Sequence, residues 1–371
     1  MDKTRQMEIL VIGAGAIGTY IGGSLALRGH RVVFVERPEI AAELRERGLR
    51  LQHSTPSTQR FPFNNAQPAL SLLKGSTFHV VASLEEALTP SASTSPFNVA
   101  IFALKSYDTP SAIQSLLAAR RSQLAIPPVL CLSNGVDNEP ALAEALGTEK
   151  VIAGTVTTAI GRRAVGDIVV ERLRGIGIAG GHALSGDLLA AFNNAGLNAR
   201  LYLKANDMKW SKMLTNLMAN ATSAILDMTP AEIFSHPGLY QLEVEQLREA
   251  LRVMAAWRIG IVNLPRTPVR LLALGVRLPA LISRPLLIRA VGSGRGGKMP
   301  SFHIDLHSGR GQSEVDFLNG SVVRHGQQAG ISTPVNHLLN ETLLALTRKE
   351  LPIDAFTRQP EKLLGRLPKP G

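Results

Sequence analysis

The chain has 371 residues, 45% of them hydrophobic and 19% charged, and carries a formal net charge of +11. This length exceeds the size at which one hydrophobic core usually stops growing, so we expect two domains. The single cysteine, Cys131, excludes an intramolecular disulfide, and we therefore expect a cytoplasmic protein. Because neither a signal-peptide core nor a bilayer-spanning apolar stretch is recognisable, we expect a soluble protein without stable membrane association.

The first elements form a nucleotide-binding pattern. An apolar run at residues 8–12 meets a glycine-rich turn, a helical pattern follows at 19–28, and a second apolar run covers 31–35. Glycines at these spacings permit a tight turn, a close approach of the backbone to a pyrophosphate and tight packing of helix on strand. The sequence therefore predicts a dinucleotide site formed by Gly13, Ala14, Gly15, Ala16, Ile17 and Gly18.

The choice of nicotinamide cofactor is read at the end of the second apolar run. An acid there favours the ribose diol of NAD, whereas an arginine favours the 2′-phosphate of NADP. Glu36 and Arg37 are adjacent at this point. The pattern alone leaves both cofactors open.

Two more apolar runs end in polar residues. Residues 48–83 are polar and irregular, which suggests excursions between short strands, and we assign no chemistry to them. Residues 98–104 and 129–132 read as buried strands, which are followed by Lys105 and by Asn134. Because ligands of open parallel sheets lie outside the carboxyl ends of the strands, we expect both side chains on the same rim as the glycine-rich turn.

The remaining chain changes from strands to helices. We predict strands at 151–159 and 167–178, the second interrupted by Arg172, Arg174 and Gly175, then a helix at 186–194 and a closing strand at 199–203. Helical periodicity dominates from Asp207 onward, with Asn206 or Asp207 as the N-cap of the first helix. We expect a dinucleotide-binding domain over 1–205, a helical domain over 206–350 and a C-terminal tail over 351–371.

A polar stripe opens the helical part. On one continuous α-helix, Lys212, Asn216 and Asn220 share one face, while the residues between them are suited to a core. Buried polar groups need partners, either in the protein or in a ligand. The alternative is that Lys212 extends to solvent and the two asparagines pair locally.

Basic residues are concentrated late in the chain. Between Glu249 and Asp305 there are nine basic residues and no acidic one. Nucleic acid, an anionic membrane or another polyanion could be attracted to the segment 258–298. Short amphipathic helices with a solvated basic face explain the pattern as well, and we favour that reading.

His303 and His307 form the one candidate metal pair. They stand at positions i and i+4, which could join two imidazoles on one helical face. No third ligand with recognisable spacing follows. We therefore predict no metal site.

Five short motifs occur in a fixed order from residue 8 to about residue 347. They are Gly13-Ala-Gly-Ala-Ile-Gly18, Lys105-Ser-Tyr-Asp108, Ser133-Asn-Gly-Val136, Trp210-Ser-Lys212 with Asn216 and Asn220, and Ser313-Glu-Val-Asp-Phe-Leu-Asn-Gly320. In this order they resemble the ketopantoate reductase (2-dehydropantoate 2-reductase) family. The resemblance implies an α/β fold in which a Rossmann-type N-terminal domain precedes an all-helical domain, similar to the C-terminal domain of 6-phosphogluconate dehydrogenase.

The resemblance also implies an activity, the transfer of a hydride from NADPH to the keto carbon of ketopantoate, which gives pantoate for pantothenate and coenzyme A biosynthesis. Lys212 is similar to the lysine that protonates the carbonyl oxygen, and Glu314 to the glutamate that supports the catalytic and cofactor sites. The other roles implied are substrate contacts for Asn216 and Asn220, carboxylate binding for Ser301, the junction of cofactor and substrate for Lys105 and Asn134, and the 2′-phosphate for Arg37. A homodimer is compatible with this assignment, and nucleic acid is not an expected partner.

Several features differ from the family pattern. The spacing between Asp305 and Glu314 is one residue longer than expected, so Glu314 is either displaced or kept in place by a bulged turn. The segments 54–79 and 264–298 are enlarged. Two alternatives therefore stay open, namely a reductase of another 2-oxo acid and a non-catalytic protein that senses nucleotides or binds polyanions.

Overall fold

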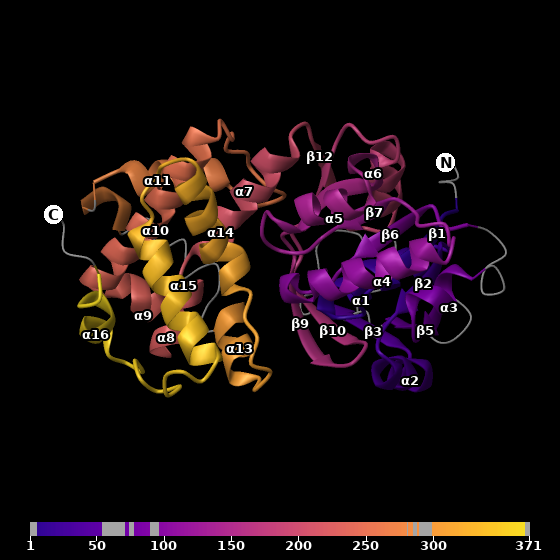
Figure 1. Ribbon diagram of the computed structural model, residues 1–371, viewed down its shortest axis with the longest axis horizontal. Helices are drawn as coiled ribbons and strands as arrows, with labels where there is room; N and C mark the ends of the chain where they lie inside the picture. Colours follow the sequence, from indigo (N-terminus) through magenta and orange to yellow (C-terminus); the bar gives the residue numbers. More distant parts are fainter. Residues whose placement is uncertain are drawn as a thin grey trace. The chain divides into compact units, whose positions relative to one another are not determined.

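The protein is represented by a computed structural model, which describes residues 6–53, 71–73, 78–89, 96–279, 281–284, 288 and 299–367. The chain forms two compact units (Figure 1). Unit 1 comprises Met1–Ser133, Asn138–Ala205 and Pro265–Thr267, and unit 2 comprises Asn134–Asp137, Asn206–Leu264 and Pro268–Gly371. Each unit thus includes one short segment from the other half of the sequence.

Unit 1 contains an eight-stranded sheet in the order β12-β11-β8-β7-β6-β1-β2-β5. The strands are β1 Glu8–Ile12, β2 Arg31–Val35, β5 Phe78–Val81, β6 Val99–Phe102, β7 Val129–Cys131, β8 Val151–Val156, β11 Ile176–Ala179 and β12 Ala199–Tyr202. Six neighbouring strands of the sheet, β8, β7, β6, β1, β2 and β5, are parallel, and β11 pairs with β8 in the antiparallel sense. The predicted bounds of β1 and β2 are confirmed. The prediction succeeds because parallel strands that are covered on both sides need apolar residues on both faces.

Successive residues of β1 supply two different cores. Ile9 and Val11 pack in one cluster, and Leu10 and Ile12 pack in the other. The first cluster includes residues of α1 (Ala16–Ala26) and α6 (Ser185–Asn194); the second includes residues of α3 (Leu84–Leu88), α4 (Thr109–Arg121) and α5 (Asn138–Leu146). Unit 1 also contains α2 (Pro38–Arg47) and the short 3-10 helices η1 (Ser106–Asp108) and η2 (Thr148–Lys150). Helices on both faces leave the carboxyl edge of the sheet to carry loops.

A second, four-stranded sheet belongs to unit 1. Its order is β4-β3-β10-β9, with β3 Leu49–His53, β4 Ser71–Leu73, β9 Ala159–Ala164 and β10 Asp167–Arg172. The run predicted at 167–178 is interrupted where expected, between Arg172 and Ile176, and its two parts, β10 and β11, lie in different sheets. The chain turns at Gly175, whose φ of +150° suits glycine, and an added Cβ would lie 2.3 Å from the carbonyl oxygen of Asn198. Within the described residues of the segment 48–83, the short strands expected there are β3, β4 and β5.

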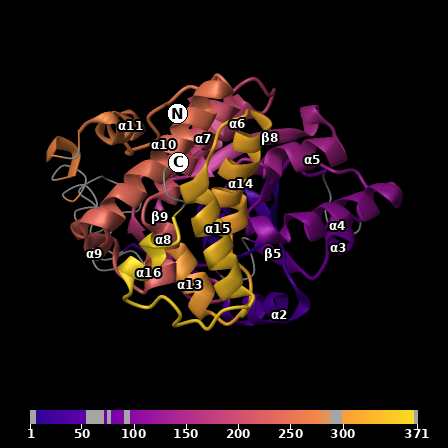
Figure 2. The same ribbon diagram turned by 60° about the vertical axis from the view of Figure 1, so that its left-hand side comes forward.

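In the part of the chain that the structure describes, unit 2 is helical. Its helices are α7 Ala205–Leu217, α8 Asn220–Leu226, α9 Pro230–Ser235, α10 Pro237–Ala256, α11 Val269–Arg277, α13 Ser301–His307, α14 Val315–Gln328, α15 Pro334–Thr347 and α16 Pro360–Leu364. Helices α14 and α15 run side by side (Figures 1 and 2). Residues 351–367 contribute to the core of unit 2, since Phe356 and Leu363 are fully buried.

A row of buried polar side chains on α10 organises unit 2. Glu243, Gln246 and Glu249 follow one another at three-residue intervals and are all fully buried. Glu249 accepts hydrogen bonds from the backbone N–H groups of Val335 and Asn336, at 2.8 and 2.9 Å, and so caps the start of α15. Burial raises the pKa of Glu249, although these hydrogen bonds favour the charged form. The core of unit 2 is therefore specified by directional bonds as well as by apolar packing.

The start of α7 differs from the prediction. The helix begins at Ala205, so Asn206 and Asp207 lie inside its first turn and neither is the N-cap. The Asp207 carboxylate instead accepts a hydrogen bond from the backbone N–H of Gly260 at 2.8 Å. Among the described residues, none of the helices combines the length and the low polarity needed to cross a bilayer.

Candidate active site

The three glycines of the glycine-rich motif, two in the loop between β1 and α1 and one in the first turn of α1, have three different surroundings. Gly13 has φ +93°, a conformation that favours glycine. A Cβ on Gly15 would meet nothing within 4 Å, whereas one on Gly18 would lie 1.9 Å from the carbonyl oxygen of Gly13 and 3.2 Å from Val11. These are the surroundings expected for a tight turn, a backbone open to a pyrophosphate, and a close contact of helix with strand. The residues present therefore fit a dinucleotide.

The loop lies at the switch point of the sheet. Strand β2 lies on one side of β1 and β6 on the other, and Ile12 pairs with both Val35 and Phe102. The loops that follow the three strands therefore start in one row. Gly15, the N-cap of α1, has no side chain, so the first N–H groups of this helix are not capped by it and point to where a phosphate would bind.

Glu36 and Arg37 differ in their surroundings. One carboxylate oxygen of Glu36 accepts a hydrogen bond from the backbone N–H of Ala14 at 2.6 Å, and the other accepts from the N–H of Arg37 at 3.2 Å. The acid is therefore bound to the glycine-rich loop. Arg37 precedes α2 and is exposed.

Lys105 stands on the same rim, between two anchored residues. Before it, the carbonyl oxygen of Leu104 accepts a hydrogen bond from the hydroxyl of Ser133 at 2.8 Å. After it, Ser106 is buried and accepts a hydrogen bond from the side chain of Asn138 at 3.3 Å. The loops after β6 and β7 are thereby tied together, and Lys105 itself is half-buried.

The polar stripe predicted for one helix is divided between two helices. Helix α7 ends at Leu217, α8 begins at Asn220, and Ala219 between them is left-handed with φ +53°. Lys212 and Asn216 are one turn apart on α7, whereas Asn220 opens the next helix. The single continuous face is therefore wrong.

The buried carboxylate of Glu243 explains this break. It accepts hydrogen bonds from the backbone N–H of Ala219 at 2.7 Å, from the Gln246 amide at 2.5 Å, and from the Thr222 hydroxyl. Three donors satisfy the buried charge and hold the left-handed turn, in which alanine is otherwise unfavourable. Sequence reasoning missed Glu243, because its partners lie more than 20 residues away except for Gln246.

The residues expected to contact substrate form two pairs within unit 2. The amide of Asn216 donates to the side-chain oxygen of Asn134 at 3.1 Å. The amide of Asn220 donates to the hydroxyl of Ser301 at 3.3 Å, and its oxygen accepts from the N–H of Phe302 at 3.1 Å. The fold therefore brings four of the predicted site residues together in two pairs, although their substrate contacts stay a prediction.

Asp137 anchors the segment that carries Asn134. Its carboxylate accepts hydrogen bonds from Ser321 at 2.6 Å, from Arg324 at 3.1 Å and from His325 at 2.8 Å. Burial would raise the pKa of Asp137, but the hydrogen bonds from His325, Ser321 and Arg324 outweigh it and lower the pKa to about 2. The one sequence signal for this anchor was an acid directly after the Ser133–Val136 motif.

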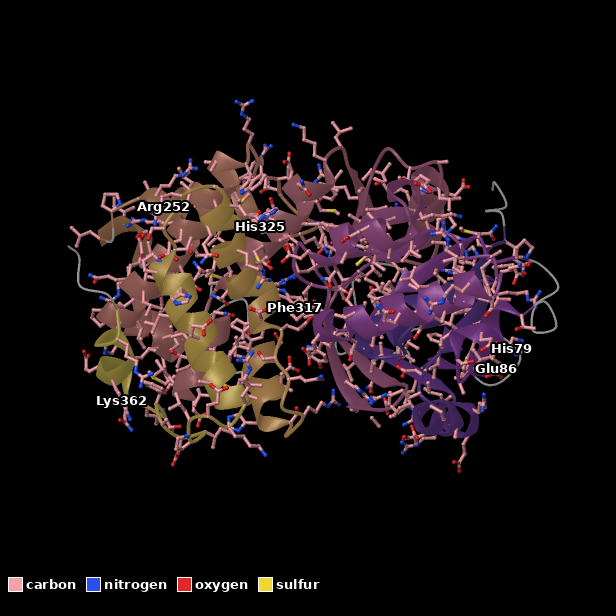
Figure 3. The ribbon with its side chains drawn as sticks, in the orientation of Figure 1. His79, Glu86, Arg252, Phe317, His325 and Lys362 are labelled. Atoms are coloured by element: carbon pink, nitrogen blue, oxygen red, sulfur yellow. The ribbon has the colours of Figure 1, made fainter. Side chains whose placement is uncertain are left out.

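The ring of His325 is itself held in place. It makes edge-to-face contacts with Trp210, at 5.3 Å between centroids, and with Trp257 at 5.9 Å. His325 lies on α14 of unit 2 and is labelled in Figure 3. Trp210 belongs to the motif that includes Lys212, so the anchor of the Asn134 segment and the start of the polar stripe share one cluster.

Glu314 lies directly before α14, with 1% of its surface exposed, and Lys212 is half-buried on α7. The turn before Glu314 contains Gly309 and Gly311, with φ +73° and +65°. Two left-handed glycines let the chain bulge, which accommodates the longer spacing after Asp305 while Glu314 is buried. The catalytic roles of Lys212 and Glu314 stay predictions.

Comparison with known proteins covers both units. The family model described as ketopantoate reductase PanE/ApbA matches residues 9–180, and the model of its C-terminal part matches residues 204–347. The 2-dehydropantoate 2-reductase of Pyrococcus horikoshii is 27% identical over 338 residues, which cover 90% of this chain and 95% of that protein.

Two solved structures are also similar. A PanE/ApbA family ketopantoate reductase from Ralstonia eutropha JMP134 has a TM-score of 0.73 at 25% identity, over 93% of this chain and 99% of that one. D-mandelate dehydrogenase with NADH and anilino(oxo)acetate has a TM-score of 0.69 at 20% identity, over 92% and 99% respectively, and supports the fold alone. Since the family models match the α/β part and the helical part in turn, this chain belongs to the ketopantoate reductase family.

Proposed function

We propose that the protein reduces a small 2-oxo acid with NADPH, and that ketopantoate, which becomes pantoate, is its substrate. The observation that carries this proposal is the pairing of neutral site residues within unit 2, Asn134 with Asn216 of α7 and Asn220 of α8 with Ser301 of α13. Carboxamides and a hydroxyl can bind a carboxylate and a hydroxyl without adding charge, which suits a small anionic substrate. The curated relatives named 2-dehydropantoate 2-reductase point to the same substrate.

Lys212 is the proposed acid. A bound NADPH supplies the hydride that reaches the keto carbon. As the C=O bond becomes a single bond, the Lys212 ammonium gives a proton to the carbonyl oxygen, and the product is an alcohol. The neutral amine then regains a proton from water. Asn216, one turn further along α7, holds the substrate beside this ammonium, and Glu314 supports the ammonium and the cofactor.

Arg37 is the proposed reader of the 2′-phosphate. Each oxygen of the neighbouring Glu36 already accepts a backbone N–H, whereas Arg37 is exposed and carries the positive charge that a phosphate needs. The use of NAD is the alternative, supported by the acid itself and by the NADH bound to D-mandelate dehydrogenase. Replacing Arg37 with alanine should weaken the binding of NADPH far more than the binding of NADH. Equal effects on both cofactors would mean that another residue binds the 2′-phosphate.

A panel of 2-oxo acids, measured with NADPH and with NADH as the loss of nicotinamide absorbance, tests the function. We expect the highest kcat/KM for ketopantoate with NADPH. Lys212→Ala should lower kcat by about 10²- to 10⁴-fold with an unchanged circular dichroism spectrum, since it removes the acid but not the fold. Lys204→Ala is the matched control, because Lys204 is exposed just before α7.

The panel also separates the alternatives. A higher kcat/KM for a bulkier or aromatic oxo acid would favour a different reductase of the same kind, as the likeness to D-mandelate dehydrogenase allows. Full activity of Lys212→Ala would reject the proposed acid. Turnover of none of the oxo acids would reject the function as a whole.

A further inference from the structure

Three side chains of the kinds that bind metal ions lie close together at the C-terminal end of α8. His303 and His307 lie one turn apart on α13, with ring centroids 4.2 Å apart. The Nε2 atom of His303 is 2.8 Å from a carboxylate oxygen of Asp227. One ligand atom from each of the three residues lies within 4.8 Å of the other two. The sequence showed the two histidines, whereas only the fold brings in the third residue.

The packing of two short helices creates this arrangement. Helices α8 and α13 are in contact, and Asn220 at the start of α8 binds the N–H of Phe302 near the start of α13. Asp227 ends α8 in a left-handed conformation, with φ +48° and ψ +49°. Aspartate is among the few residues that adopt this conformation readily, and there its side chain turns toward α13.

The ligand set indicates the kind of ion. Two imidazoles and one carboxylate are the protein ligands of zinc sites that keep a fourth position for water, whereas calcium and magnesium prefer oxygen ligands alone. Bonds of about 2.1 Å place tetrahedral ligands about 3.4 Å apart, so small side-chain rotations would close the present separation. The Asp227 side chain is 49% exposed and that of His303 17% exposed, so an ion can enter from solvent while one imidazole is held firmly.

We propose that Asp227, His303 and His307 bind one divalent transition-metal ion of the zinc type, with water as the fourth ligand. When the ion binds, it replaces the hydrogen bond between Asp227 and His303, and all three side chains become its ligands. The ion then links the end of α8 to α13. These two helices are already joined at their other contact by Asn220, so a bound ion stabilises the pair at two points.

Zinc binding to the full-length protein without a histidine tag tests the proposal. The protein is stripped with a chelator, dialysed and titrated with Zn²⁺ by calorimetry, and Co²⁺ is used to record the visible spectrum of the site. We expect one zinc ion per chain, a four-coordinate Co²⁺ spectrum, and a higher midpoint of thermal unfolding in the presence of zinc.

Two variants remove single ligands. His307→Ala and Asp227→Asn should each weaken zinc binding by about 10- to 100-fold or more, since the loss of groups that only support a ligand already has effects of this size. Asp227→Asn keeps a residue that tolerates the left-handed conformation, so it tests the carboxylate without disturbing the turn. His79→Ala is the matched control, because His79 is an exposed histidine on β5 of unit 1, labelled in Figure 3, and should leave zinc affinity unchanged.

The contrary results are equally specific. Absence of saturable zinc binding would overturn the proposal. Zinc affinity that is unchanged in folded His307→Ala and in folded Asp227→Asn would do the same, because the ion would then be bound elsewhere. All of these measurements are independent of oxo-acid turnover, so they can fail while the proposed reductase function holds.

Discussion

The glycine-rich loop of unit 1 and the paired polar residues of unit 2 are built in different ways. In unit 1, six consecutive residues supply the backbone shape, three in the turn after β1 and three in the first turn of α1, and Gly18 contacts Gly13 across only five positions. In unit 2, the paired residues are 82 positions apart for Asn134 and Asn216, and 81 for Asn220 and Ser301. One site depends on local conformation, the other on long-range packing.

This difference predicts how each region can be damaged. The backbone of the loop is sensitive to added volume, because its shape leaves no room for a side chain at Gly18. The paired residues of unit 2 are sensitive to the loss of buried acceptors such as Glu243 and Asp137, which position the segments that carry them. Volume and hydrogen bonding are therefore the two properties to change.

The largest effect is expected at Glu243. Glu243→Gln leaves one acceptor oxygen for three donors and turns an N–H₂ group toward them, so we expect a loss of about 3 kcal/mol in the free energy of unfolding. Urea denaturation measures it. Glu245→Gln on the same helix is the control, because Glu245 is more exposed and pairs with arginines at the surface. Equal stability of the two variants would contradict the role assigned to Glu243.

Two glycines of the loop should respond in opposite ways. Gly18→Ala places a methyl group against the backbone of Gly13 and should destabilise the protein by about 2 kcal/mol. Gly15→Ala meets open space, so it should keep the stability of the wild type and weaken cofactor binding alone. Thermal unfolding and cofactor titration of both variants separate these effects. A loss of stability in Gly15→Ala would argue that the loop is closed by the protein itself.

The smallest effect is a pH dependence at Asp137. Its pKa is about 2 in the folded protein against 3.8 in the reference state, so its stabilisation is fully present above pH 4 and is lost as the pH falls toward 2. After allowance for partial exposure, this contribution is about 1–2 kcal/mol. Asp137→Asn should lower stability at pH 7 by this amount and remove this part of the acid dependence.

Urea unfolding between pH 2 and pH 7 checks this effect. The exposed Asp354 offers a control, since Asp354→Asn should leave the pH profile of the wild type unchanged. If Asp137→Asn instead kept the full acid dependence, the hydrogen bonds from Ser321, Arg324 and His325 would not stabilise the charged carboxylate as described.

Local patterns in the sequence were enough for the first two strands and the glycine-rich turn of unit 1. The apolar runs give β1 and β2 their bounds, because strands covered on both faces need continuous apolar residues, and the glycine spacing is set by the backbone of one turn. The family resemblance and the α/β fold with a helical second part are confirmed by the family models, which match residues 9–180 and 204–347, and by the similar solved structure.

Tertiary structure decided the rest. The segment 167–178 divides between two sheets, because each half finds its own neighbouring strands, and the stripe of Lys212, Asn216 and Asn220 breaks at Ala219. The break depends on Glu243, as the candidate metal cluster depends on Asp227. The partners lie 24 residues apart in the first case and 76 in the second, so no periodicity within one element could reveal them. Buried charges and sets of metal ligands are completed by the side chains that the fold brings within hydrogen-bond distance. The order of residues along the chain does not tell which distant side chains these are.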